Sequence, residues 1–130
     1  MSLYATIILT HGDLGRSLVK TTEDIVGEQK NVFIFSNKKD SLSVLTKKIM
    51  TCIGKSSAEK IILFTDLKGG SCWHIGAMLK TQNDNITVIS GVNMPMLVTY
   101  FSNIYELNFD ELIRKTVHDG CRGIEIAGEI

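Results

Sequence analysis

The sequence predicts an α/β fold, with a central, mostly parallel sheet of about four strands and helices on both faces. Two observations predict it. Short apolar runs alternate along the chain with longer stretches in which apolar residues recur at helical spacing. Hydrophobic residues make up 44% of the 130 residues, which is enough for the core of one domain of ordinary size, covering residues 1–130.

Residues 3–9 form the first expected strand, because they are apolar and uncharged, as in a central parallel strand. The helix after it is expected to begin behind Asp13, a good N-cap, and to end at Gly27. The residues expected to face the sheet recur at helical spacing. They are Leu14, Leu18, Thr22, Ile25 and Val26.

Residues 32–35 and 60–64 form the next two expected strands. Between them, Asp40 is the expected N-cap of a helix that ends at Gly54. The apolar positions of this helix are Leu42, Leu45, Ile49 and Ile53.

The second half of the chain continues the alternation, with a helix over about 71–80 and a strand over 86–89. Pro95 fits the first turn of the next helix. Asn108 is the expected cap of the last helix, and Gly120 its end. The positions expected to face inward in this last helix are Phe109, Leu112, Ile113, Thr116 and Val117.

Residues 123–126 form an expected short terminal strand. So short a strand buries little surface by itself, and it would bury more by pairing with the sheet edge of a partner subunit. The sequence therefore predicts a homodimer in which this strand is exchanged.

Composition excludes several classes of protein. Lys+Arg and Asp+Glu balance at 14 each, which argues against nucleic acid or an anionic membrane as the main partner. No apolar run has the length of a transmembrane helix, and no basic segment precedes an apolar one as in a signal peptide. The three cysteines (Cys52, Cys72 and Cys121) have no CxxC spacing, so we expect reduced thiols in a cytoplasmic protein.

Polar residues follow three of the expected strands, and they are His11, Thr65 with Asp66, and Asn93. In a parallel sheet these strand ends lie at one edge, where ligands bind. An imidazole attacks through one nitrogen when the other is held, and a carboxylate holds it by accepting the N–H. Asp66 is therefore the expected partner of His11.

Glycines and a hydroxyl near this edge favour an anion such as phosphate. Gly12 leaves room for a ligand to approach the backbone. Gly69, Gly70 and Ser71 stand at an expected helix start, where N–H groups and a hydroxyl can bind phosphoryl oxygens. Each feature also has a plain structural interpretation, as a capping residue or a tight turn. Their convergence favours a site where His11 accepts a phosphoryl group.

Five segments carry a resemblance to a known family: THG (10–12), VGEQ (26–29), LFTDLKGGS (63–71), GVNMPML (91–97) and FDEL (109–112). In this order they resemble the IIA component of the mannose/fructose/sorbose class of the bacterial phosphoenolpyruvate-dependent sugar phosphotransferase system. The resemblance covers nearly the whole chain.

The resemblance implies a phosphotransferase in which His11 is transiently phosphorylated by the carrier protein HPr, with Asp66 as its partner. The phosphoryl group would pass to a IIB component and so serve a membrane IIC/IID permease. The family also implies a homodimer whose last strand joins the partner's sheet in antiparallel fashion. No metal and no cofactor are expected. The implied phosphoryl-binding residues are Gly12, Thr65, Gly69, Gly70 and Ser71, and Asn93 and Met94 are candidates for a partner surface.

The chain departs from the family pattern beside this site. Cys72, Trp73 and His74 stand where the family usually has proline, an apolar residue and asparagine, and Lys68 replaces a frequent tryptophan. Core packing or solvation is the simpler interpretation of each.

Three other functions compete with this interpretation. A regulatory sensor of the same fold, phosphorylated at His11, is the main alternative, and genes for IIB and membrane components nearby would discriminate. An independent phosphohistidine enzyme would typically carry arginine and glutamate where Thr10 and Asp13 stand. A nucleotide-binding module would need GxGxxG or GxxxxGK[ST], and neither occurs.

Overall fold

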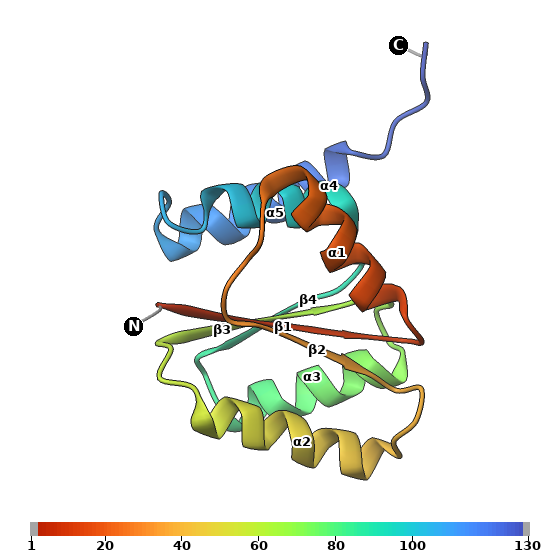
Figure 1. Ribbon diagram of the computed structural model, residues 1–130, viewed down its shortest axis with the longest axis vertical. Coiled ribbons are helices and arrows are strands. Elements are labelled where there is room, and N and C mark those ends of the chain that lie inside the picture. The colour runs from red at the N-terminus through yellow and green to blue at the C-terminus, as the bar shows by residue number, and fades with distance from the viewer. Residues whose placement is uncertain (1–2, 129–130) are drawn as a thin grey trace.

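The computed structural model describes residues 3–128 as three layers, with a parallel sheet between two layers of helices (Figure 1). The strands are β1 (Tyr4–Thr10), β2 (Val32–Ser36), β3 (Lys60–Thr65) and β4 (Ile86–Ile89). One face is covered by α1 (Leu14–Val26), α4 (Met94–Asn103) and α5 (Phe109–Arg122), and the other by α2 (Leu42–Lys55) and α3 (Ser71–Gln82). The predicted α/β fold is confirmed.

The sheet separates two hydrophobic cores, and β1 contributes to both. Ile7 and Leu9 pack on the α2–α3 side, whereas Ile8 packs on the side of α1, α4 and α5. All three are at most 1% exposed. Burial of both faces is the reason that this strand is a continuous apolar run, and each such side chain contributes roughly 1.5–3 kcal/mol relative to exposure.

The strand order is β2-β1-β3-β4, so β1 and β3 are neighbours although β2 lies between them in sequence. From β1 the chain runs outward to β2, and from β3 it runs outward on the other side to β4. The two connections diverge from the carboxyl ends of β1 and β3, and such a switch point is where open α/β sheets bind ligands. His11 follows β1 and Asp66 follows β3, so both stand at this point.

The predicted caps are partly right. Asn108 caps α5, and Pro95 lies in the first turn of α4, as expected. Asp40 does not cap α2, because the Ser41 hydroxyl accepts the N–H of Val44, and Asp40 pairs instead with Lys48 at 2.8 Å. Helices α2 and α5 run past their predicted ends, Gly54 and Gly120, by one and two residues.

The buried face of α1 is shifted from the predicted one. Leu14 and Ile25 are exposed, whereas Gly15 and Val19 are buried with Thr22. A Cβ on Gly15 would lie 2.8 Å from Ile8 Cγ2, so glycine allows α1 to approach β1 closely. Two further residues predicted to face inward are also exposed: Leu42 in α2 and Val117 in α5.

Residues 124–126 are not part of a strand in this single chain, and both isoleucines of the segment are exposed, Ile124 by 81% and Ile126 by 70%. Exchange of this segment with a partner subunit therefore stays a prediction. Within residues 3–128, no helix has the length and hydropathy needed to cross a membrane.

Candidate functional site

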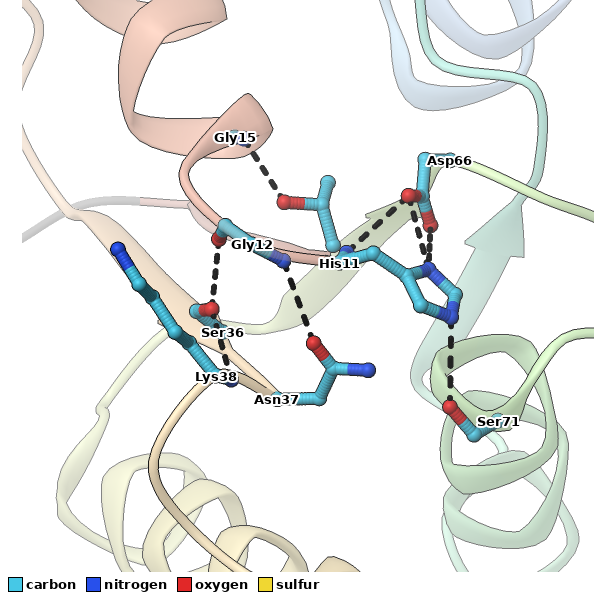
Figure 2. Close-up of polar contacts among 9 residues, drawn as sticks. His11, Gly12, Gly15, Ser36, Asn37, Lys38, Asp66 and Ser71 are labelled. Atoms are coloured by element: carbon cyan, nitrogen blue, oxygen red, sulfur yellow. Dashed lines mark hydrogen bonds and ion pairs between the residues drawn. The ribbon is translucent and has the colours of Figure 1, made fainter.

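The imidazole of His11 is held on one side by Asp66. Nδ1 lies 2.9 Å from Oδ2 and 3.1 Å from Oδ1 of Asp66, and the backbone N–H of His11 donates to Oδ2 at 3.1 Å (Figure 2). A carboxylate only accepts hydrogen bonds, so Nδ1 carries the proton and Nε2 keeps its lone pair. The side chain of Asp66 is 12% exposed and that of His11 42% exposed, so the partner is sheltered while the ring is accessible.

Nε2 faces the beginning of α3 (Figure 2). The Ser71 hydroxyl oxygen lies 3.5 Å from Nε2. Gly70 is the N-cap of α3, and a Cβ there would lie 3.2 Å from Cε1 of His11, so glycine lets the imidazole come this close. Gly69 has a φ of +82°, a conformation that favours glycine. The first-turn N–H groups of a helix have no intrahelical acceptor and attract anions, so they suit phosphoryl oxygens.

The turn that carries His11 is fixed by the last residue of β2, Ser36, and by Asn37, which follows it. The Ser36 hydroxyl donates to the carbonyl oxygen of Gly12 at 2.6 Å, and the N–H of Gly12 donates to Oδ1 of Asn37 at 3.2 Å. Ser36 and Asn37 are not among the site residues that the sequence predicts. The signal that could have found them is that β2 ends at the same sheet edge as β1 and β3.

Helix α1 begins directly after Asp13, as predicted, but its first turn is capped by another side chain. The side chain of Asp13 makes no capping hydrogen bond, and Thr10 takes that role by accepting the N–H of Gly15 at 2.8 Å. Asp13 instead pairs with Lys38 at 2.9 Å, and this hydrogen bond holds the pKa of the Asp13 carboxyl below its usual value. Asp13 therefore stands at the predicted N-cap position, but its side chain does not cap the helix.

Thr65, a predicted phosphoryl-binding residue, is fully buried. Its carbonyl oxygen accepts the N–H of Val92 at 3.0 Å, and its hydroxyl has no hydrogen-bond partner within the described residues. This backbone hydrogen bond joins the end of β3 to the loop after β4. A phosphoryl-binding role for Thr65 stays a prediction.

Asn93 and Met94 make contacts within the fold. Asn93 caps α4 by accepting the N–H of Met96 at 3.0 Å, and its amide donates to the Gly120 carbonyl at 3.2 Å. The sulfur of Met94 accepts the Thr22 hydroxyl at 3.3 Å. No hydrogen bond in the described chain joins Asn93 to His11, so the third strand end does not join the pair, and a docking role for both residues stays a prediction.

The residues that depart from the family pattern have different environments. Cys72 is completely buried, and burial, followed by the charge of Asp66, raises the pKa of its thiol. Trp73 and the exposed His74 stack edge to face, with ring centroids 5.2 Å apart, and Lys68 is exposed. Ligand atoms of His11, Asp66 and Cys72 lie within 4.8 Å of one another, a set that could hold a metal ion.

Comparison with known proteins identifies relatives of this chain. The family model described as "PTS system fructose IIA component" matches residues 5–117. The mannose-specific EIIAB component of the phosphotransferase system (PTS) of Escherichia coli (strain K12) is 34% identical over 124 residues, which cover 93% of this chain. This chain spans 38% of the length of that relative. The sorbose-specific EIIA component of Lacticaseibacillus casei is 26% identical over 82% of this chain and 78% of its own length.

A solved structure has the same fold. The crystal structure of phosphotransferase system component EIIA from Streptococcus agalactiae matches with a TM-score of 0.84 and 24% sequence identity. The match covers 95% of this chain and 96% of that one.

Proposed function

Because this chain belongs to the family of PTS system fructose IIA components, we propose that it is a phosphoryl carrier that accepts a phosphoryl group on Nε2 of His11. The donor is phospho-HPr, and the acceptor is a IIB component that serves sugar uptake. The observation that carries the proposal is the asymmetry of the imidazole. Asp66 occupies Nδ1 at 2.9 Å, whereas Nε2 points to the start of α3.

The transfer follows from this asymmetry. The Nε2 lone pair attacks phosphorus, an N–P bond forms, and the N–P bond to the donor histidine breaks with its electron pair left on the donor nitrogen. The positive charge that develops on the His11 ring is stabilised by the Asp66 carboxylate. The protein supplies positioning and charge stabilisation, as in other phosphoryl transfers.

The phosphoryl oxygens need hydrogen-bond donors, because Nε2 itself bonds to phosphorus. The Ser71 hydroxyl and the free N–H groups of the first turn of α3 stand on that side of the ring. These groups are neutral, so they bind the anion more weakly than a lysine or arginine side chain would. Moderate binding suits a carrier, because the group must leave again for the IIB component.

The assembly is part of the proposal. Residues 124–126 include two exposed isoleucines, which would be covered if this segment paired with the edge of a partner's sheet. We expect a homodimer in the cytoplasm, and deletion of residues 123–130 should lower the dimer fraction in sedimentation. A truncated protein that stays fully dimeric would rule out strand exchange.

The direct test is phosphorylation of the purified protein with phosphoenolpyruvate, the general phosphotransferase enzyme and HPr. We expect one phosphoryl group per chain, labile in acid and stable in base as a phosphoramidate is. His11→Ala should abolish the label. His74→Ala changes an exposed histidine three residues after Ser71 and should keep the label. A folded wild-type protein that takes no label would overturn the proposal. A label that no IIB component can remove would favour the regulatory alternative.

A further inference from the structure

Cys72 adds a sulfur to the nitrogen and oxygen of the His11–Asp66 pair. Its Sγ, a carboxylate oxygen of Asp66 and a ring nitrogen of His11 all lie within 4.8 Å of one another. We infer that these three side chains form a binding site for a soft divalent cation, Zn²⁺ above all, and that the bound cation prevents His11 from accepting a phosphoryl group. The inhibitory part rests on the proposed function, whereas metal binding does not.

The spacing of the three side chains is near that of a zinc site. Zinc bonds of about 2.0–2.1 Å to nitrogen, 2.0–2.2 Å to oxygen and 2.3 Å to sulfur place tetrahedral ligand atoms roughly 3.3–3.6 Å apart. Nδ1 of His11 is already 2.9 Å from Asp66 Oδ2. The other distances are at most 4.8 Å, so ligation of one cation needs movements on the order of one ångström. Three protein ligands leave a fourth position for water.

The donor set selects the metal. Thiolate and imidazole bind Zn²⁺ well, whereas Mg²⁺ and Ca²⁺ prefer oxygen ligands only. Cys72 lies in the first turn of α3 and is 0% exposed, so its sulfur is held by the helix among core residues, facing the pair rather than bulk water. Burial also shelters the thiol from reaction with solutes that do not enter the site.

The ligands come from three separate places: the loop after β1, the loop after β3 and the start of α3. They are 55 and 6 residues apart in sequence, so no metal-binding motif is visible and none was expected. Of the three ligands only Cys72 supplies sulfur, so the inferred site depends on cysteine at this position.

Metal binding and phosphoryl acceptance exclude each other. When the metal binds, the thiol and any ring N–H that it replaces release their protons to solvent, and no electron is transferred. Asp66 then ligates the cation and no longer stabilises positive charge on the imidazole. A ring with one nitrogen on Zn²⁺ is also a weaker nucleophile, since the cation withdraws electron density.

The first experiment measures metal binding alone. The protein, freed of metal with a chelator, is titrated with Co²⁺, and thiolate ligation is detected by the charge-transfer absorption of the Co–S bond. We expect one site per chain. Cys72→Ala should abolish this absorption and weaken Zn²⁺ binding about 100-fold in competition with a chromophoric chelator. Cys52→Ala and Cys121→Ala remove the other two thiols and should leave both readouts unchanged.

The second experiment measures transfer from isolated phospho-HPr with and without one equivalent of Zn²⁺. We expect Zn²⁺ to slow acceptance at least tenfold in the wild type and to leave the rate of Cys72→Ala unchanged. The metal site is overturned if the wild-type protein shows no Co–S absorption, or if the absorption is lost in Cys121→Ala and kept in Cys72→Ala. Full acceptance with Zn²⁺ bound overturns the inhibition. Metal binding by a protein that never accepts a phosphoryl group would instead refute the proposed function and leave the site standing.

Discussion

Replacing Asp66 by asparagine tests the proposal that the carboxylate activates His11. Asp66 accepts two hydrogen bonds from one residue, the backbone N–H at 3.1 Å and Nδ1–H at 2.9 Å. Both hydrogen bonds go to Oδ2, and Oδ1 lies 3.1 Å from Nδ1. An amide has the same shape but only one oxygen. That oxygen, in the place of Oδ2, accepts both hydrogen bonds without the charge, whereas the NH₂ group can face Nδ1 in the place of either oxygen. If it faces Nδ1, the ring proton moves to Nε2 and the attacking lone pair is lost.

The structure sets the size of the effect. The side chain of Asp66 is 12% exposed, so its charge is only weakly screened. A hydrogen bond to a charged group contributes about 1.5–3 kcal/mol and a neutral one about 0.5–1.5 kcal/mol. Loss of the difference, roughly 1–2 kcal/mol, slows transfer about 5- to 30-fold. This is less than in a hydrolytic triad, because attack by an imidazole on phosphorus requires no prior proton removal.

The assay is single-turnover transfer from phospho-HPr, with the fold checked by circular dichroism. Asp13→Asn is the matched control, because Asp13 is two residues from His11 in sequence but pairs with Lys38 instead. We expect the control to react at the wild-type rate. A wild-type rate in Asp66→Asn, or an equal loss in both variants, would remove Asp66 from the mechanism.

Two further predictions concern stability. Tyr100→Phe should lower the free energy of unfolding, measured in urea, by about 1–3 kcal/mol, because the buried Thr6 hydroxyl loses its hydrogen-bond partner at 2.7 Å. The control is Tyr105→Phe, which changes a residue that is 77% exposed and should leave the free energy of unfolding unchanged. The hydrogen bond from Thr99 is the main cause that lowers the pKa of the Asp119 carboxyl. The ionised carboxylate therefore stabilises the fold above the usual pKa of aspartate, and this stabilisation is lost as pH falls through the lowered pKa. Asp119→Asn should therefore melt below the wild type at neutral pH and together with it in strong acid, and a gap that widens in acid would contradict this.

The layered fold and the His11–Asp66 pair were predictable from the sequence because both rest on regular features. A strand buried on both faces must be apolar throughout, and residues that follow parallel strands meet at one edge. The burial of Gly15 in place of Leu14 was not predictable, since helical periodicity gives a face but not how closely the helix approaches the sheet. Choosing between Asp40 and Ser41 as a cap likewise depends on one residue of register.

The contacts missed by the sequence cross between loops. Ser36 and Asn37 fix the Gly12 turn because β2 lies directly beside β1, which only the strand order reveals. The proximity of Cys72 to the His11–Asp66 pair depends in the same way on how α3 is placed against the sheet. Periodicity and local spacing do not carry this information.

The central claim, that Asp66 reserves Nε2 of His11 for the phosphoryl group, is tested most directly by nuclear magnetic resonance of the phosphorylated protein labelled with ¹⁵N at histidine. Phosphorus coupling and the nitrogen shifts distinguish Nε2 from Nδ1 and His11 from the exposed His74 and His118. We expect a single phosphohistidine, His11, with phosphorus on Nε2 and the proton on Nδ1. Phosphorus on Nδ1, or on either other histidine, would contradict the account.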